Sequence, residues 1–211
     1  IYNHMLTKIA ELAILPAHTL CFNLKQTFVA SIWQILTPLL LGSRLIIYDT
    51  KLAFNPLEFF EVVKKDKISV LEIVPAVLNT YLNLVAQDKK SLIPLTHLKK
   101  LVLTGEKVSA ELVNRFYGLY QIPLVNAYGQ SECSDDTLHY QIPYDTKTRQ
   151  VPIGHPALNT QVYILDKFQQ LLPLNCIGEL YISGDGVSPG YLHNQNLTKE
   201  KFMVNPFSSG T

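Results

Sequence analysis

Helical and strand patterns take turns along the first 126 residues of this chain. After an opening helical stretch they alternate in the order 19–22, 32–40, 44–48, 56–63, 68–73, 75–85, 100–103, 110–120 and 124–126. Pro56 and Pro75 stand where helices can begin, and Gly42 stands where one can end. Parallel strands need crossover connections, which are usually helices, so the alternation is typical of a parallel sheet with helices on its faces. The sequence therefore predicts the α/β class.

The opening helix is predicted to have one apolar face. Met5, Ile9, Leu12 and Ala13 recur at helical spacing. We expect the helix to pack through this face.

The pattern changes after about residue 150 to short strands separated by turns. Residues 161–165 and 179–183 are predicted strands, and the turns between them carry Gly, Pro, Asn and Asp. We therefore expect two parts: an α/β subdomain over 1–140 and a small β-rich, barrel-like subdomain over 141–211. The polar segment 145–150 is the predicted linker between them. Because the chain opens on Ile1 and closes on Ser209-Gly210-Thr211, we interpret it as an excerpt of a longer polypeptide.

Composition limits the classes of partner. Hydrophobic residues make up 47% of the chain and charged residues 17%, with a net charge of +1 and no long charged run, so no nucleic-acid surface is expected. No apolar run approaches the roughly 20 residues of a membrane span, and no signal peptide is apparent, so a cytoplasmic protein without membrane contact is expected. The three cysteines and six histidines, including His139 and His155, lack metal-site spacing, and we assign them no chemistry.

The segment Asn126-Ala127-Tyr128-Gly129-Gln130-Ser131-Glu132 carries the most chemistry. Tyr128 can stack on a purine base, and Gly129 lets the backbone turn past a ligand. Ser131 can donate to a phosphate oxygen, and Glu132 can hold Mg²⁺. The segment begins at the end of a predicted strand, where α/β sheets tend to bind ligands. These residues favour a nucleotide site.

A resemblance rests on this segment and three others. These are Phe28-Val29-Ala30-Ser31-Ile32-Trp33 with Pro38 to Gly42, Leu103-Thr104-Gly105-Glu106, and the glycine-rich Gly178-Glu179-Leu180 through Gly190-Tyr191-Leu192. In this order they resemble the adenylation domains of nonribosomal peptide synthetases, within the wider acyl-adenylate-forming family. The four matches cover nearly the whole chain. Pro189 and Gln130 depart from the residues common in the family, but both lie beside the residues matched to ATP.

The resemblance implies ATP-dependent activation of a small carboxylic acid as an acyl-adenylate. The product would load a phosphopantetheine thiol on a carrier domain, in an assembly line that also contains condensation-type domains. Residues matched to the nucleotide are Gly105, Glu106, Asn126, Ala127, Tyr128 and Gly129. Ser131 would touch the α-phosphate, and Glu132 would help to hold Mg²⁺. The family's phosphate loop, its ribose-binding Thr-Gly-Asp and its catalytic lysine would lie outside this excerpt, so the fragment alone should not catalyse the reaction.

Carried over by position, the acid pocket would be lined by Val29, Ala30, Trp33, Glu72, Val102, Thr104, Ala127, Asp135 and Asp136. Val29 stands where relatives that take α-amino acids have an aspartate that clamps the ammonium. An apolar residue cannot compensate a buried ammonium, so an ordinary α-amino acid fits poorly. The three acidic residues favour a β-amino or ω-amino acid. Equally, Glu72 can pair with a lysine of the protein, and Asp135 and Asp136 can cap the next segment or face solvent.

Several alternatives stay open from the sequence. An α-keto or α-hydroxy acid would suit the loss of the clamp equally well. Were Phe22-Asn23 the true motif, the clamp would be an asparagine, but Ser31 and Trp33 follow Phe28 at the family's spacing. A free-standing acyl-CoA ligase or a non-catalytic scaffold domain would share much of this pattern.

Overall fold

The structure is a computed structural model that describes residues 1–144 and 147–207, so the predicted linker lies partly outside the described residues. Its main sheet has seven strands in the order β2-β1-β3-β4-β5-β6-β7. Strands β2, β1, β3, β4 and β5 are parallel, and β6 and β7 are antiparallel additions. Their bounds are β1 Thr19–Phe22, β2 Arg44–Ile47, β3 Val70–Ile73, β4 Lys100–Leu103, β5 Leu124–Gln130, β6 Asp135–Ile142 and β7 His155–Pro156. The predicted α/β class is confirmed.

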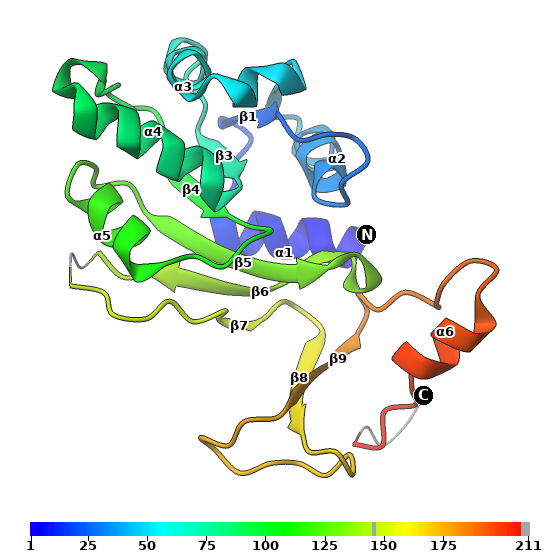
Figure 1. Cartoon of the computed structure of the whole chain (residues 1–211). Helices are drawn as coiled ribbons and strands as arrows, with labels where there is room; N and C mark the ends of the chain where they lie inside the picture. The colour runs from blue at the N-terminus through cyan, green and yellow to red at the C-terminus, as the bar shows by residue number, and fades with distance from the viewer. Residues whose placement is uncertain (145–146, 208–211) are drawn as a thin grey trace.

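Helices cover both faces of this sheet (Figure 1). One face packs against α3, α4 and α5 through a large apolar core that includes Phe60, Leu71 and Leu101. The other face carries α1 and α2, and a smaller cluster joins Val70, Val102 and Trp33 there. Neighbouring strand residues alternate between the two faces, and both faces are covered, which is why these strands are mostly apolar. The bounds are α1 Tyr2–Leu12, α2 Ser31–Leu41, α3 Pro56–Lys65, α4 Pro75–Gln87 and α5 Ala110–Tyr117, with short 3₁₀ turns η1 Thr50–Phe54, η2 Lys89–Ser91 and η3 Ser131–Cys133.

Helix α1 packs through a face that shares Met5 and Leu12 with the predicted apolar face but differs from it at Ile9 and Ala13. Its buried residues include Met5, Lys8 and Leu12, whereas Ile9 is half-buried and Ala13 is exposed. Positions 5, 8 and 12 follow helical spacing as well as 5, 9 and 12 do, but the first set places a charged side chain inside. The prediction failed because it required the inward residue to be apolar, and Lys8 finds its partners on distant strands.

Strands β5 and β6 form a long hairpin that extends beyond the rest of the sheet. Strand β5 was predicted to end at Asn126 but continues to Gln130, and its pairing with β6 shifts register between Tyr128 and Gly129. A Cβ atom on Gly129 would lie 1.8 Å from the carbonyl oxygen of Asp135, so only glycine fits there. Such bulges turn side chains in new directions beside ligand sites.

A small antiparallel sheet follows the main one. It pairs β8 (Thr160–Leu165) with β9 (Glu179–Gly184) and leads to α6 (Gln195–Lys201). The boundary expected at 140/141 falls inside β6, and β7 still pairs with β6, so the second sheet begins only at Thr160. Within the described residues, no helix combines the length and apolar character that crossing a bilayer requires.

Candidate functional site

The predicted nucleotide loop lies at the exposed end of the β5–β6 hairpin. Asn126 and Ala127 are buried in β5, whereas Tyr128 is 37% exposed and Ser131 is exposed. Ser131 and Glu132 belong to the short turn η3 that connects the two strands. The loop therefore presents a tyrosine ring, a hydroxyl and a carboxylate along one accessible edge.

A pocket of about 280 Å³ adjoins this edge. It is lined by the segment that follows β4, by the second half of β5 and by one residue before β7, namely Gly105, Glu106, Lys107, Val108, Asn126, Ala127, Tyr128, Gly129 and Ile153. All six residues matched to the nucleotide by resemblance are among them. The Glu106 carboxylate also accepts a hydrogen bond of 3.2 Å from the backbone N–H of Ala76, at the start of α4.

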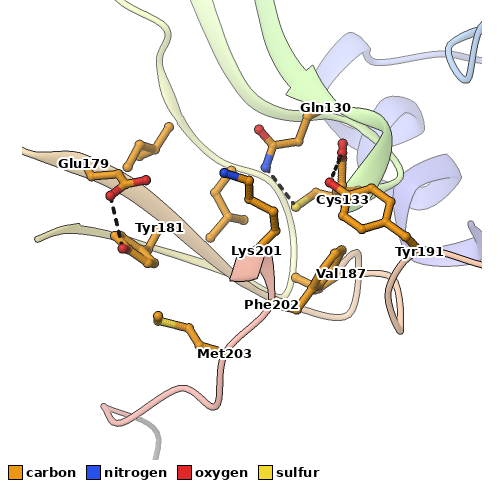
Figure 2. Close-up of a pocket in the computed structure, with 12 residues that line it drawn as sticks. Gln130, Cys133, Glu179, Tyr181, Val187, Tyr191, Lys201, Phe202 and Met203 are labelled. Carbon is orange, nitrogen blue, oxygen red and sulfur yellow. Dashed lines mark hydrogen bonds between the residues drawn. The ribbon is translucent and has the colours of Figure 1, made fainter. Parts of the chain in front are cut away.

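Glu132 is held by the segment that follows the small sheet. The Tyr191 hydroxyl donates to Glu132 Oε1 at 2.5 Å, and the Ser188 N–H donates to the Glu132 carbonyl at 2.8 Å. The hydrogen bond to Glu132 raises the pKa of Tyr191. Beside this contact lies a pocket of about 390 Å³ between the hairpin end, β9 and α6 (Figure 2). The glycine-rich segment thus touches the nucleotide loop directly.

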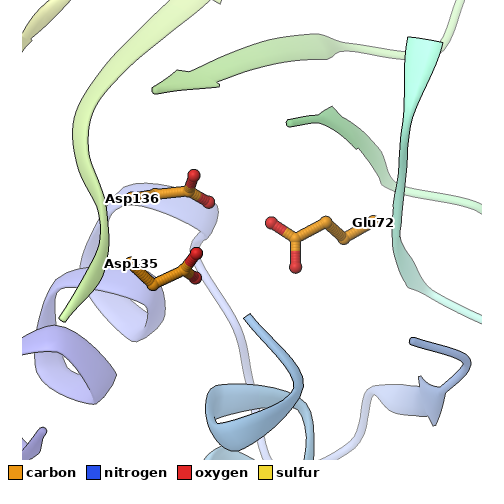
Figure 3. A group of neighbouring side chains, drawn as sticks. All are labelled: Glu72, Asp135 and Asp136. Carbon is orange, nitrogen blue, oxygen red and sulfur yellow. The ribbon is translucent and has the colours of Figure 1, made fainter. Parts of the chain in front are cut away.

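The three acidic residues predicted for the acid pocket converge on the opposite side of the hairpin. Figure 3 shows Glu72 pointing from β3 toward Asp135 and Asp136 of β6. One carboxylate oxygen from each lies within 4.8 Å of the others, and all three residues are buried. The structure therefore brings together residues separated by more than sixty positions in the sequence.

Lys8 of α1 enters the centre of this cluster. Its Nζ lies 3.2 Å from Glu72 Oε1 and forms a short ion pair with Asp136 Oδ2, and its side chain has no exposed surface. The Nζ also lies 5.0 Å from the centre of the Trp33 ring. The pairing of Glu72 with a lysine of the protein, left open from the sequence, is thus observed. The amine stands among the carboxylates, so they do not form an open metal site.

Two more of the predicted pocket residues complete this network. The Trp33 indole N–H donates to Glu72 Oε2 at 2.6 Å, and the Thr104 hydroxyl donates to Asp136 Oδ1 at 2.6 Å. Asp135 contributes differently, because its Oδ2 is buried without a hydrogen-bond partner among the described residues. The nearest group is His4 Nε2 at 3.3 Å, which also has no aligned partner.

The apolar members of the predicted pocket are arranged around these polar groups. Val102 and Ala127 pack with Trp33 in the cluster beneath α1 and α2. Ala30 is buried directly before α2, and Val29 is half-buried in the preceding turn. Asn23 is occupied by protein contacts, since its Nδ2 donates to the Glu72 carbonyl at 2.9 Å and its Oδ1 accepts from Gln34 at 3.2 Å.

Sequence reasoning missed three residues of this region: Lys8, His4 and His139. His139 is 1% exposed, and neither ring nitrogen has a hydrogen-bond partner among the described residues. Burial, followed by the charge of Lys8, lowers the pKa of His139 to about 3. A usable signal was the spacing of His4, Lys8 and Leu12 at intervals of four, which places both polar residues on the buried side of α1.

Comparisons with known proteins identify the family of this chain. The family described as AMP-binding enzyme matches residues 2–192. Bacitracin synthase 3 of Bacillus licheniformis is 36% identical over 190 residues, covering 87% of this chain and 3% of that protein. Tyrocidine synthase 3 of Brevibacillus parabrevis is 31% identical over 210 residues, covering 100% of this chain and 3% of its own length. The chain thus spans only a small fraction of these relatives.

Solved structures show the same fold. A four-domain nonribosomal peptide synthetase bound to AMP and glycine aligns with a TM-score of 0.83 and 26% identity, covering 97% of this chain and 15% of that one. The N-terminal subdomain of Klebsiella oxytoca NpsA, in complex with 3-hydroxybenzoyl-AMSN, aligns with a TM-score of 0.81 and 21% identity, covering 96% and 52%. The chain belongs to the AMP-binding enzyme family, among the adenylation domains of nonribosomal peptide synthetases.

Proposed function

We propose that the protein containing this chain activates a carboxylic acid with ATP, forming an acyl-adenylate and pyrophosphate. The observation that carries the proposal is the tip of the β5–β6 hairpin, where Tyr128 and Gly129 adjoin the 280 Å³ pocket while Asp135 and Asp136 belong to the buried acidic cluster. Two reactants bound on either side of one hairpin would meet near Ser131. The family match and the solved relative bound to AMP support this arrangement.

The nucleotide would bind along the exposed edge. Tyr128 would stack on the adenine, with Gly105, Glu106, Asn126, Ala127 and Gly129 around the base and Ser131 at the α-phosphate. Glu132 suits Mg²⁺, because its carboxylate is partly accessible and Mg²⁺ usually takes one or two protein carboxylates beside phosphate oxygens. The ion, when bound, would reduce the negative charge on the phosphates.

The chain's own contribution to such a reaction is positioning. The substrate carboxylate attacks the α-phosphorus and pyrophosphate leaves, so no protein nucleophile is needed. Ser131 and Glu132 would orient the phosphates, and the hairpin would fix the distance between the nucleotide and the acid. Holding both reactants in a reactive geometry accounts for much of the rate gain in reactions of this kind.

The acid would differ from an ordinary α-amino acid. Val29 offers no charge to an α-ammonium, whereas Glu72, Asp135 and Asp136 provide carboxylates that are more deeply buried than Val29. We therefore favour a β-amino or ω-amino acid, and an α-keto or α-hydroxy acid is the alternative. The acyl group would pass to a phosphopantetheine thiol on a carrier domain, next to condensation-type domains; the similarity to a four-domain nonribosomal peptide synthetase supports a multidomain setting.

The test is ATP–pyrophosphate exchange by the full-length protein with a matched set of four-carbon acids. The set comprises 2-aminobutanoic, 3-aminobutanoic, 4-aminobutanoic, 2-oxobutanoic, 2-hydroxybutanoic and butanoic acid. Exchange should be fastest with 3-amino or 4-aminobutanoic acid. Fastest exchange with 2-aminobutanoic acid would contradict the interpretation of Val29, and no exchange with any acid would favour a scaffold domain. Acyl transfer to coenzyme A in place of a carrier thiol would identify an acyl-CoA ligase.

Glu132→Gln separates the role of the carboxylate from general damage. We expect exchange to fall by roughly 10²–10³ and to require more Mg²⁺, because a preorganised charge near the phosphates is lost. Glu61→Gln is the control, since Glu61 is an exposed carboxylate on α3 that pairs with Lys64 of the same helix. An unchanged Mg²⁺ dependence in Glu132→Gln would remove Glu132 from the metal site.

A further inference from the structure

Lys8 is unusual because it is a lysine without exposed surface at the centre of the acid pocket. It reaches Glu72 on β3 and Asp136 on β6, and its ammonium lies over the Trp33 ring. A buried lysine is rare unless it is paired, and here both partners are pocket carboxylates. The cation of this site thus comes from α1, a helix that contains none of the predicted pocket residues.

The Glu72 and Asp136 carboxylates are satisfied within the protein, because Lys8 donates to both of them, Trp33 donates to Glu72 and Thr104 donates to Asp136. Burial alone would favour a neutral amine, but the charges of Asp136 and Glu72 raise the pKa of Lys8 above its usual value. Asp136 is desolvated too, yet the charge of Lys8 holds its pKa below the usual range. Burial raises the pKa of Glu72 above its usual value, and the charge of Lys8 opposes that rise. Each of the two carboxylates therefore has its partners inside the protein.

Asp135 is the carboxylate left over. It is 6% exposed, its Oδ2 has no hydrogen-bond partner among the described residues, and Figure 3 shows it pointing toward Glu72. The ring of His4, 3.3 Å away, is not aligned to donate to it. Within the described part of the chain, His139 on the same strand keeps both ring nitrogens without hydrogen bonds. A buried, unpartnered carboxylate is costly, and a cationic ligand group would relieve it.

We propose that Lys8 is a specificity-determining residue that neutralises Glu72 and Asp136 from within the protein, leaving Asp135 for one cationic group of the substrate. This inference rests on the proposed function and narrows its substrate class. The pocket takes an acid with a single amine away from the α-carbon. It rejects acids with two such cationic groups. The second group would lie beside the charge of Lys8, and Glu72 and Asp136 would already be bonded to that lysine.

The test compares Lys8→Met with the unchanged full-length protein on two acids, 3-aminobutanoic and 3,4-diaminobutanoic acid. Methionine keeps much of the side-chain length and removes the charge. The unchanged protein should prefer the monoamine, measured as the ratio of kcat/KM values in pyrophosphate exchange. Lys8→Met should shift that ratio by at least 10-fold toward the diamine, whose second ammonium can replace the missing lysine.

Lys100→Met is the matched control. Lys100 also ties α1 to the sheet, since its Nζ donates to the Glu11 carbonyl at 2.8 Å, away from the acidic cluster. Its removal should leave the ratio unchanged. Should Lys8→Met fail to fold, Lys8→Met with Asp136→Asn removes the freed charge as well. That double variant should fold and regain the preference for the monoamine.

The outcomes distinguish this inference from the proposed function. The role of Lys8 would be overturned if the unchanged protein catalysed exchange and Lys8→Met shifted the ratio of kcat/KM values no more than Lys100→Met does. Absence of exchange with every acid would overturn the proposed activity. In that case, the rise in Tm that each acid produces without ATP decides the inference. The inference is supported if the monoamine raises the Tm of the unchanged protein more and the diamine raises the Tm of Lys8→Met more. It is overturned if neither acid raises the Tm, or if the order of the two acids is the same in both proteins.

Discussion

The two sides of the β5–β6 hairpin differ in exposure and in how their charged groups are paired. On the exposed side, Tyr128 and Ser131 present polar and aromatic groups to solvent at the proposed nucleotide site. On the buried side, Glu72 and Asp136 are satisfied by Lys8 before any ligand arrives. The exposed edge suits a reactant common to the whole family, while the buried cluster suits discrimination between acids. From this comparison we infer that substrate choice depends on which buried carboxylates are already paired with Lys8.

The largest effect is expected on the buried side, in the stability of Lys8→Met. Removing the lysine leaves Asp136 buried without its counter-ion, which should lower the free energy of unfolding by about 3–5 kcal/mol. Lys100→Met, measured alongside by denaturant titration, should lose far less because Lys100 is only partly buried. Equal losses in the two variants would mean that the buried cluster contributes no special stability.

The pH dependence of stability tests the buried side a second way. The pKa of His139 is lowered to about 3 from an ordinary 6.5, so between these values the unfolded chain binds a proton that the folded chain does not. Stability should therefore fall as the pH drops from 6.5 toward 3, by up to about 1.4 kcal/mol per pH unit. The variant His139→Leu should show a shallower slope.

Two features make that slope interpretable. Asp136, whose pKa is lowered, loses its contribution only in more acidic solution, and Glu72, whose pKa is raised, acts with the opposite sign. The difference between the unchanged protein and His139→Leu isolates the histidine. His97 is exposed, and His97→Leu should leave the slope as it was. A slope unaffected by His139→Leu would show that the buried ring is protonated in the folded state.

Gly129→Ala should disturb both sides at once. The added Cβ would lie 1.8 Å from the Asp135 carbonyl oxygen, so the two strands must separate at the bulge, at a cost of about 1–3 kcal/mol. Gly118→Ala is a suitable control, because the nearest atoms to its Cβ are 3.4 Å away. Thermal unfolding measures both variants. An unperturbed Gly129→Ala would contradict the tight crossing of the strands.

Tyr128→Ala should have the smallest effect and act only on the exposed side. Loss of the stacking surface should weaken nucleotide binding by about 0.5–1.5 kcal/mol, seen as a higher KM for ATP. The KM for the acid should stay the same, because Tyr128 lines the nucleotide pocket and is not a member of the acidic cluster. Tyr128→Phe keeps the ring and should bind ATP normally. Equal changes in both KM values would show that the two sides are coupled.

The same contrast between the exposed and the buried side explains which parts of the site could be predicted from the sequence. The exposed edge is built from consecutive residues of one loop, so its members could be named from their order alone. The alternation of periods likewise predicted the parallel sheet and its helices, apart from the length of β5 and the register of α1. The buried side depends on contacts across 64 and 128 positions, between Lys8 and its two carboxylates. The sequence supplied the acids but not their partner.

Helix α1 shows why that partner was missed. The expected face placed Ile9 inside because an apolar residue is normally cheaper to bury than a lysine. That rule fails for Lys8 because two carboxylates on β3 and β6 partner it, and only the folded sheet brings Glu72 and Asp136 together. The predicted boundary at 140/141 lies within β6, a strand that the sequence patterns did not indicate and that completes the main sheet together with β7.

The position of Trp33 gives this pocket an optical property. It is the sole tryptophan of the chain, and its indole N–H is bonded to Glu72 while the Lys8 ammonium lies 5.0 Å from its ring. Indole emission shifts with the electric field across the ring and with the strength of the N–H bond. Any event that moves a charge in the cluster therefore changes the emission of the only tryptophan fluorophore in these 211 residues. The pocket carries its own spectroscopic label.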